Sequence, residues 1–313
     1  MIEKELLYRL NQYYLISFKK LELLREGGCV SYKAYSEDKI YFLKKIPQAF
    51  YHTAYNSIDI LLFLEDKDIL TPHILLTKTA KPYVEIQIDN NENMLVLFEY
   101  LEGSEPDIIE DYEEIGKIVG KLHSIMKTYK GSLSTPQKEY YIERYLEILK
   151  QKNYPKEKIS EYASYGDELW DKVKDLPRGF CHGDMHRGNL LKTPSGQIYV
   201  LDFDTASWSF PMYDIMIMCN GTDYFEYHED NYEKTFHMLR QFLKGYELYR
   251  KLEIKELEVF TDLIAIYHYQ LQATIVQIYG LDCIDEDFID DQMDWLLHWK
   301  KQSERNKGKN DGL

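Results

Sequence analysis

Residues 179–214 read GFCHGDMHRGNLLKTPSGQIYVLDFDTASWSFPMYD, and this stretch decides how the rest of the chain is interpreted. Two short apolar runs of strand-forming residues, 190–192 and 199–201, flank the turn-forming residues 193–196. The sequence therefore predicts a β-hairpin here. A hairpin brings the residues before its first strand and after its second strand to the same end.

The open end of this hairpin is expected to gather oxygen ligands. Setting Asn189 opposite Val200 places Asn189 and Asp202 at the same end, and the loop that carries Asp184 enters there too. Carboxylate and amide oxygens suit Mg²⁺, which is usually held by one or two carboxylates together with substrate phosphates. An Asp-rich turn is often only a solvated loop, but three constrained positions favour a magnesium site.

The spacing of these residues matches a catalytic loop. An Asp followed five positions later by an Asn, in a His-x-Asp context, is the kinase pattern in which the Asp takes the hydroxyl proton and the Asn holds metal. His182, Asp184 and Asn189 fill those places. Residues 202–204, Asp-Phe-Asp, then stand where kinases carry their magnesium-binding Asp-Phe-Gly.

The pattern HGDxHxxN, a hairpin and then LDFD resembles the aminoglycoside phosphotransferase and choline kinase superfamily of small-molecule kinases. The resemblance implies an α+β, protein-kinase-like bilobal fold. Residues 1–101 would form a small N-terminal nucleotide-binding lobe with an antiparallel β-sheet, and residues 102–313 a mostly helical C-terminal lobe with the substrate site. It also implies that Asp184 is the catalytic base and that Asn189 and Asp202 hold Mg²⁺.

The same resemblance assigns a nucleotide site. The run 39–46 is similar to the family's third strand, whose Lys contacts the nucleotide phosphates. A strand alternates its faces, so only one of Lys44 and Lys45 can point that way, and the local pattern favours Lys44. The run 94–103 resembles the strand and connection between the lobes, whose backbone near Glu99 and Leu101 would receive adenine.

Two further positions follow from the resemblance, and three more from the residue types themselves. Relatives carry a Glu on the next helix as partner for the strand Lys, but the nearest acid here is Asp59, either a shorter partner or a solvent-facing residue. Asp214 resembles an acid that braces the catalytic loop. His123 is expected to be a packed, hydrogen-bonded residue rather than a ligand, and Gly116 and Gly120 in the same helix indicate close packing.

Composition argues against several classes of main partner. The chain of 313 residues has 44% hydrophobic residues and a net charge of −15, which disfavours nucleic acid and anionic membranes as partners and tolerates a cationic substrate. Four widely spaced cysteines suggest neither a zinc site nor a disulfide framework. With no signal peptide and no apolar run of membrane-spanning length, a cytoplasmic protein is expected.

Apolar periodicity gives the expected elements. They are helices at 2–12 and 48–66, from 112 and from 211, and at 231–250 and 255–280, with strands within 14–46 and at 73–78, 82–88 and 94–100. The tyrosine-rich section 129–165 is either an excursion over the site or an ordinary connection. The acidic segment 282–294 is a solvated loop before the last helix or, as in aminoglycoside-modifying relatives, a receiver of substrate amino groups. Residues 300–313 are expected to fray.

The expected function is ATP- and Mg²⁺-dependent phosphorylation of a hydroxyl group on a small molecule, such as an aminoglycoside or choline. Two alternatives remain open. The Asp-Phe-Asp-Thr-Ala sequence at 202–206 also resembles spore-coat-associated kinase-like proteins, which allows a protein Ser/Thr kinase. The unrecognisable glycine loop at Gly27–Gly28 and the missing helix Glu allow a non-catalytic protein that binds a partner.

Overall fold

The computed structural model describes residues 2–88, 90–107 and 109–307, and it divides into two compact units. The first unit comprises the described residues up to Pro106 together with Tyr129–Ser132 and Arg187–Ala206. The rest of the chain forms the second unit. An antiparallel five-stranded sheet in the first unit and a mainly helical second unit confirm the predicted α+β fold class. The lobe boundary at residue 101 stays a prediction.

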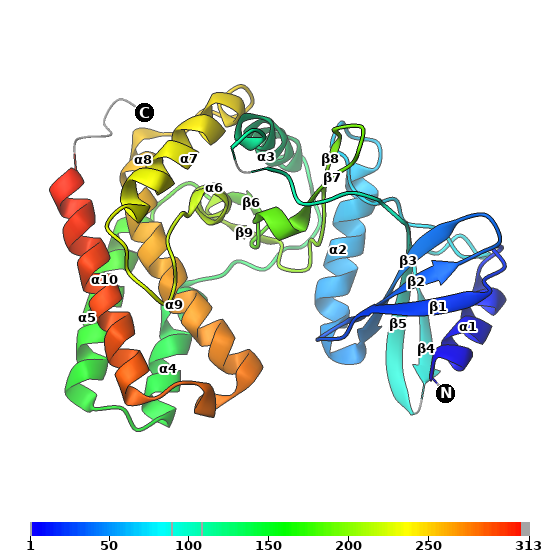
Figure 1. Cartoon of the computed structure of the whole chain (residues 1–313), viewed down its shortest axis with the longest axis horizontal. Coiled ribbons are helices and arrows are strands. Elements are labelled where there is room, and N and C mark those ends of the chain that lie inside the picture. The colour runs from blue at the N-terminus through cyan, green and yellow to red at the C-terminus, as the bar shows by residue number, and fades with distance from the viewer. Residues whose placement is uncertain (1, 89, 108, 308–313) are drawn as a thin grey trace. The chain divides into compact units, whose positions relative to one another are not determined.

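A twisted antiparallel sheet forms the body of the first unit (Figure 1). Its strands are β1 (Lys20–Arg25), β2 (Val30–Tyr35), β3 (Ile40–Pro47), β4 (Val84–Ile88) and β5 (Asn91–Glu99), in the order β1-β2-β3-β5-β4. Helix α2 (Tyr51–Leu64) follows β3 after a short 3₁₀ turn at Gln48–Phe50.

Helix α1 (Ile2–Tyr13) packs on this sheet because its apolar residues recur at helical spacing. Leu6 and Leu10 are fully buried and join a core that contains Leu43 of β3 and Leu97 of β5. Leu43 faces this core, and the strand alternates sides, so its neighbour Lys44 lies on the opposite face of the sheet.

The expected strand at 73–78 is wrong, although its residues do touch the sheet. Only an isolated bridge joins Ile74 to Phe98, with Leu75 N donating to Leu97 O at 2.8 Å. Strand β4 already occupies this edge of β5 as far as Leu95, so little of β5 is left for another partner. The turn expected between the last two strands is shorter than predicted, with Asn90 at a φ of 63°; Asp89 lies outside the described residues.

The predicted hairpin is present, shifted by one residue in register. Strands β7 (Leu190–Lys192) and β8 (Ile198–Val200) pair with Leu190 opposite Val200, not Asn189 as expected. Thr193 N donates to Gln197 O at 2.8 Å, so the loop includes Gln197. The hairpin belongs to the first unit, where Lys192 exchanges two backbone hydrogen bonds with Ser104.

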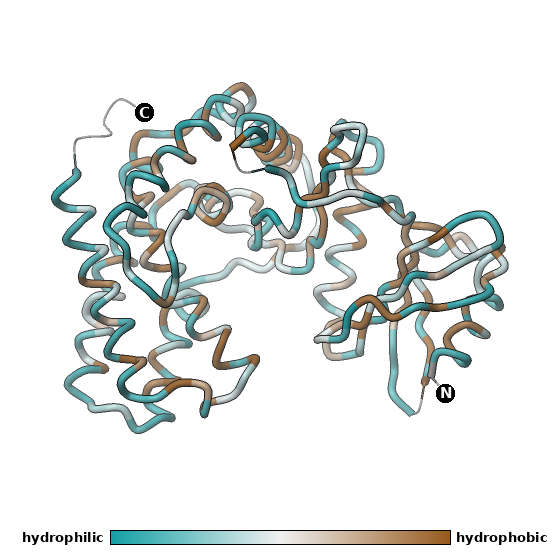
Figure 2. The backbone as a smooth tube through the Cα atoms, in the orientation of Figure 1, coloured by the Kyte–Doolittle hydropathy of each residue, from teal (hydrophilic) through white to brown (hydrophobic). Residues whose placement is uncertain are grey.

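Helices make up most of the second unit (Figure 1). They are α3 (Tyr112–Met126), α4 (Arg144–Gln151), α5 (Lys156–Val173), α6 (Pro211–Cys219), α7 (Asn231–Tyr246), α8 (Ile254–Glu258), α9 (Phe260–Tyr279) and α10 (Glu286–Asn306), with a π-helical turn at Glu139–Glu143, a 3₁₀ turn at Leu281–Cys283 and the short antiparallel pair β6 (Gly179–Cys181) and β9 (Ser207–Ser209). All nine residues of α6 are buried, and the apolar stretch is brown in Figure 2. Among the described residues, no helix has the length and hydropathy to span a membrane.

Helices α3 and α7 approach each other closely, as the two glycines of α3 predicted. A Cβ atom on Gly116 would lie 2.0 Å from Phe242 O, and one on Gly120 would lie 2.5 Å from Tyr246 O. Gly245 of α7 makes the reciprocal approach to Glu113 O. These positions therefore set the distance between the two backbones.

Two segments of undecided structure are helical. The section 129–165 contributes α4 and the start of α5, which pack against α9 and form an ordinary part of the helical unit. The acidic segment is not mainly a loop, because Asp285 caps α10 by accepting a hydrogen bond from Phe288 N at 2.9 Å. Helix α10 continues to Asn306, so the prediction that the chain frays from residue 300 is wrong for residues 300–306. Residues 308–313 lie outside the described part.

Candidate functional site

Lys44 of β3 meets two acids that follow the hairpin. Its Nζ lies 2.6 Å from Asp204 Oδ2 and 3.3 Å from Asp202 Oδ1, and all three residues belong to the first unit. The Lys44 side chain is 18% exposed, against 26% for Asp204 and 50% for Asp202. Burial favours the uncharged amine, but the charges of Asp204 and Asp202 outweigh it and raise the pKa of Lys44. The amine therefore carries a positive charge at neutral pH.

The partner of Lys44 comes from an unexpected segment. Asp59 of α2 is exposed, so the solvent-facing alternative holds for it. Asp204, which stands in the place of the kinase glycine, makes the shorter contact with Lys44 instead. The sequence signal for this partner is the second acid of Asp-Phe-Asp, which the motif comparison treats only as a replacement for the kinase glycine. The phosphate-binding role of Lys44 stays a prediction.

The two predicted metal ligands lie at the open end of the hairpin. Asn189 closes a 3₁₀ turn at Arg187–Asn189, and its carbonyl oxygen accepts from Leu201 N at 2.9 Å, which places Asp202 directly after this link. Asp202 has a φ of 55°, a left-handed conformation that Asp tolerates better than most residues.

The donor chemistry of these residues suits a hydrated cation. The described residues contain no group of three or more His, Cys, Asp or Glu side chains that could hold a metal. One carboxylate and one amide fit Mg²⁺, which keeps several waters and takes further oxygens from substrate phosphates. Metal binding by Asn189 and Asp202 stays a prediction.

Asp184 belongs to the second unit and is accessible to solvent. Its side chain is 45% exposed, and His186 Nε2 lies 3.4 Å from its Oδ2. Burial raises the pKa of Tyr224 and of Tyr267, and the negative charge of Asp184 raises both further. Asp184 therefore lies within electrostatic reach of these two half-buried tyrosines. Its role as catalytic base stays a prediction.

The tyrosines near Asp184 form an aromatic group. Tyr267 of α9 makes edge contacts with Tyr224 at 5.6 Å and with Tyr213 of α6 at 5.9 Å between ring centroids. Sequence reasoning missed these positions. The chain contains 28 tyrosines, but composition cannot say which rings meet.

The loop before Asp184 is held by a buried carboxylate. Asp214 accepts backbone hydrogen bonds from His182 N at 2.6 Å and from Gly183 N at 2.9 Å. His123 Nε2 lies 2.9 Å from Asp214 Oδ2, so His123 is packed and hydrogen-bonded, as predicted. These contacts agree with the bracing role that the resemblance implied for Asp214.

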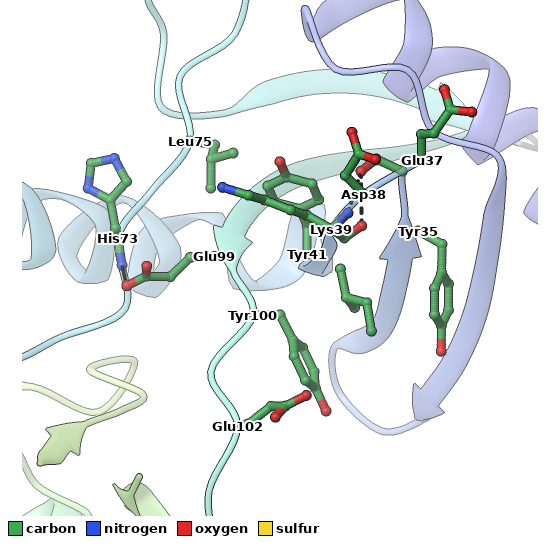
Figure 3. Close-up of a pocket in the computed structure, with 12 residues that line it drawn as sticks. Tyr35, Glu37, Asp38, Lys39, Tyr41, His73, Leu75, Glu99, Tyr100 and Glu102 are labelled. Atoms are coloured by element: carbon green, nitrogen blue, oxygen red, sulfur yellow. Dashed lines mark hydrogen bonds between the residues drawn. The ribbon is translucent and has the colours of Figure 1, made fainter. Parts of the chain in front are cut away.

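The segment expected to receive adenine borders a hollow of about 800 Å³ (Figure 3). Glu99, Tyr100 and Glu102 line it from the end of β5 and the residues after it. The Glu99 carboxylate accepts from His73 N at 3.1 Å. Leu101 is half-buried and lies outside any helix or strand.

This hollow does not suit a triphosphate. Glu37 and Asp38 add two more acids to its lining, which holds a single lysine, Lys39, and not Lys44. It therefore differs from the predicted phosphate site. Adenine binding at Glu99 and Leu101 stays a prediction.

Comparisons with known proteins agree with the family that the sequence resembles. A model of the phosphotransferase enzyme family matches residues 30–266. The chain is similar to the amicoumacin kinase of Bacillus subtilis (strain 168), with 26% identity over 183 residues, 56% of this chain and 54% of that protein. It spans about half or less of the length of the curated relatives it matches.

Two solved structures resemble nearly the whole chain. An amicoumacin kinase in complex with AMP-PNP, Ca²⁺ and Ami is 20% identical, with a TM-score of 0.76 over 97% of this chain and 94% of that chain. A microcompartment-associated aminopropanol kinase is 18% identical, with a TM-score of 0.75 over 99% of each chain. At these identities the likeness shows a shared fold.

Proposed function

This chain belongs to the phosphotransferase enzyme family, and from that premise we propose that it transfers the terminal phosphoryl group of ATP to a hydroxyl group of a small molecule. The observation that carries the proposal is the meeting of Lys44 with Asp202 and Asp204 in the unit that also holds Asn189. A charged amine beside an accessible carboxylate and an amide oxygen is what a site for a metal-bound triphosphate needs.

Within this proposal, Lys44 contacts the phosphates with an amine that its acidic neighbours keep charged. Asn189 and Asp202 would hold Mg²⁺, which would neutralise phosphate charge when bound. The accessible carboxylate of Asp184 orients the acceptor hydroxyl and takes its proton. Positioning and electrostatic stabilisation supply most of the acceleration in this chemistry.

The acceptor that the second unit supports is an alcohol that also carries an amino group. Tyr224 and Tyr267 lie within reach of the charge of Asp184, and an ammonium group is attracted both to aromatic faces and to a carboxylate. A net charge of −15 tolerates such a cation. The name of the similar aminopropanol kinase points to an amine-bearing acceptor as well.

The test is ATP consumption by the purified protein with Mg²⁺ and a panel of acceptors. The panel holds 1-amino-2-propanol, ethanolamine, choline, amicoumacin, aminoglycosides, homoserine, an uncharged sugar and a generic protein substrate. We expect turnover with an amine-bearing alcohol and none with the sugar. The Asp184→Asn variant should lose at least about a thousandfold in kcat while binding Mg-ATP as the parent does, because it keeps the side-chain shape and loses only the base. Turnover of Asp184→Asn near the parent rate would overturn the assignment.

The metal assignment has a separate test. Asp202→Ala removes a carboxylate ligand and a partner of Lys44, so we expect the gain in ATP affinity that Mg²⁺ brings to the parent to disappear. Titration of ATP with and without Mg²⁺ measures this gain. Asp38→Ala, which removes an acid elsewhere in the same unit, should keep it. An undiminished Mg²⁺ effect in Asp202→Ala would exclude Asp202 as a ligand.

A further inference from the structure

A buried chain of hydrogen bonds continues from Asp214 away from the catalytic loop. His123 of α3 bridges Asp214 and Tyr246, with Nε2 2.9 Å from Asp214 Oδ2 and Nδ1 2.8 Å from the Tyr246 hydroxyl. Arg250 donates to the Tyr246 hydroxyl at 3.2 Å and to Glu256 Oε1 at 2.7 Å. His123, Asp214, Tyr246 and Glu256 are buried, and the Arg250 side chain is only 10% exposed.

Between Arg250 and Asp214 the donors all point toward Asp214. The Asp214 carboxylate can only accept from its three N–H partners, so His123 Nε2 carries a proton. With the ring proton on Nε2, Nδ1 carries a lone pair and accepts the hydrogen of the Tyr246 hydroxyl. The Tyr246 oxygen in turn accepts from Arg250, which can only donate. Burial raises the pKa of Tyr246, so the hydroxyl keeps this hydrogen. The tautomer of His123 therefore depends on Tyr246, whose orientation Arg250 supports.

We propose that Tyr246 and Arg250 are positioning residues for phosphoryl transfer: they hold His123 in the Nε2–H tautomer, and His123 in turn holds Asp214 against the catalytic loop. This inference rests on the proposed function. It extends the loop support through α7 and the segment after it to Glu256, which also closes the capping box of α8 with Glu253.

The opposite tautomer would disturb the loop. With the proton on Nδ1, the Nε2 lone pair would face the Asp214 carboxylate at 2.9 Å, and two acceptors at that distance repel each other. Asp214 would have to move, and it holds the backbone N–H groups of His182 and Gly183 directly before Asp184. Small misplacements of reacting groups cost large factors in rate.

The packing leaves Tyr246 little freedom to adjust. A Cβ atom on Gly120, three residues before His123 on α3, would lie 2.5 Å from Tyr246 O. This close approach fixes the backbone of Tyr246 relative to His123. A chain that served only stability would also tie these helices together, so the test must separate a rate effect from a stability effect.

The first measurement is nuclear magnetic resonance of the full chain with labelled histidine and backbone nitrogen. In the parent we expect the ring nitrogen shifts of His123 to show the Nε2–H tautomer, and the amide protons of His182 and Gly183 to lie downfield. Tyr246→Phe should change both signals. Tyr269→Phe is the matched control, because Tyr269, like Tyr246, is a buried helical tyrosine with a hydrogen-bonded hydroxyl. The Tyr269 hydroxyl donates to the backbone carbonyl of Tyr162 at 2.9 Å. It should change neither signal.

The second measurement is turnover with the best acceptor of the panel. Tyr246→Phe should lower kcat about tenfold and leave the KM for ATP unchanged, because one positioning hydrogen bond is lost and the nucleotide ligands are untouched. Arg250→Met should lower kcat by a similar factor in the parent and by less than about twofold in the Tyr246→Phe background, since Arg250 acts through Tyr246. Arg250→Lys, which keeps the charge, should recover part of the loss.

The outcomes separate the two proposals. An active parent in which Tyr246→Phe matches Tyr269→Phe in kcat and in the His123 signals overturns the inference and leaves the proposed function standing. Additive losses from Tyr246→Phe and Arg250→Met also overturn it. A parent that transfers phosphate to no acceptor overturns the proposed function and the inference together.

Discussion

Lys44 connects parts of the chain that are 158 and 160 residues apart, so it offers the sharpest test at the scale of one residue. Lys44→Met removes the charge that we assign to the phosphates and leaves Asp202 and Asp204 as neighbouring like charges. We expect kcat/KM for Mg-ATP to fall about a hundredfold or more, the usual loss when one electrostatic contact to a reacting group is removed. Steady-state kinetics with varied ATP measures this.

Lys45→Met is the natural control for that variant. Lys45 follows Lys44 in β3, so its side chain lies on the other face of the sheet. Lys45→Met is therefore the same substitution one position away, outside the proposed phosphate site. It should keep kcat/KM within about threefold of the parent. Equal losses in the two variants would mean that a general loss of positive charge, and not the position of Lys44, explains the result.

At this scale the sequence predicted positions better than contacts. The spacing of Asp184, Asn189 and Asp202 comes from the chain itself, and the structure keeps the last two at the open end of the hairpin although the register slipped by one. Turn geometry sets the register of a hairpin, and the loop includes Gln197, which propensity alone did not show. The contact of Lys44 with Asp204 depends on how the sheet and the hairpin pack, so spacing could not predict it.

At the scale of elements, the close packing of α3 on α7 requires glycine at particular positions. Gly116→Ala would place a methyl group 2.0 Å from the carbonyl oxygen of Phe242, and a backbone atom cannot rotate away as a side chain can. We expect the variant to lose about 2 kcal/mol or more of unfolding free energy, because the helices must separate. Denaturant unfolding followed by circular dichroism measures the loss.

A matched glycine shows whether the effect comes from this contact. Gly27 lies in the turn between β1 and β2, where an added Cβ would find its nearest neighbour 3.8 Å away. Gly27→Ala should change stability by less than about 0.5 kcal/mol. If Gly116→Ala were equally mild, the close approach of α3 and α7 would not be a requirement of the fold.

The section 129–165 was not predicted as helical, and its tyrosines explain why. This section is polar, charged and rich in tyrosine, yet Tyr145 and Tyr162 are buried and meet edge to face at 5.6 Å. Tyrosine is apolar along its ring and polar only at its tip. The Tyr162 hydroxyl finds a backbone partner at Ile289 O, 2.6 Å away. The helical periodicity of this section was therefore hidden, because its tyrosine rings pack in the core as phenylalanine rings do.

For the whole molecule, net charge and buried titratable groups have opposite effects on the free energy of unfolding as the pH falls. The net charge of −15 becomes smaller in magnitude when carboxylates protonate, which relieves repulsion. Buried neutral groups that bind protons only on unfolding have the opposite effect.

All four tryptophans, Trp170, Trp208, Trp295 and Trp299, belong to the second unit, so their fluorescence reports the unfolding of that unit.

His268 is the buried group whose contribution can be isolated. Burial lowers its pKa from 6.5 to about 3, opposed by Gln292, and its ring stacks on Trp295 at 4.3 Å between centroids. Because the folded pKa lies below the unfolded value, its contribution to stability is complete above pH 6.5 and is lost as the pH falls toward 3. Between pH 7.5 and 5.5 this loss amounts to about 1.4 kcal/mol.

His268→Phe keeps an aromatic ring in the stack and removes the titration. From pH 7.5 to 5.5 we expect the parent to lose about 1.4 kcal/mol more unfolding free energy than this variant, measured by urea unfolding and tryptophan fluorescence. The comparison cancels the carboxylates, which both proteins share. Parallel curves for the parent and His268→Phe would mean that His268 takes up protons in the folded protein, so that burial does not hold it neutral.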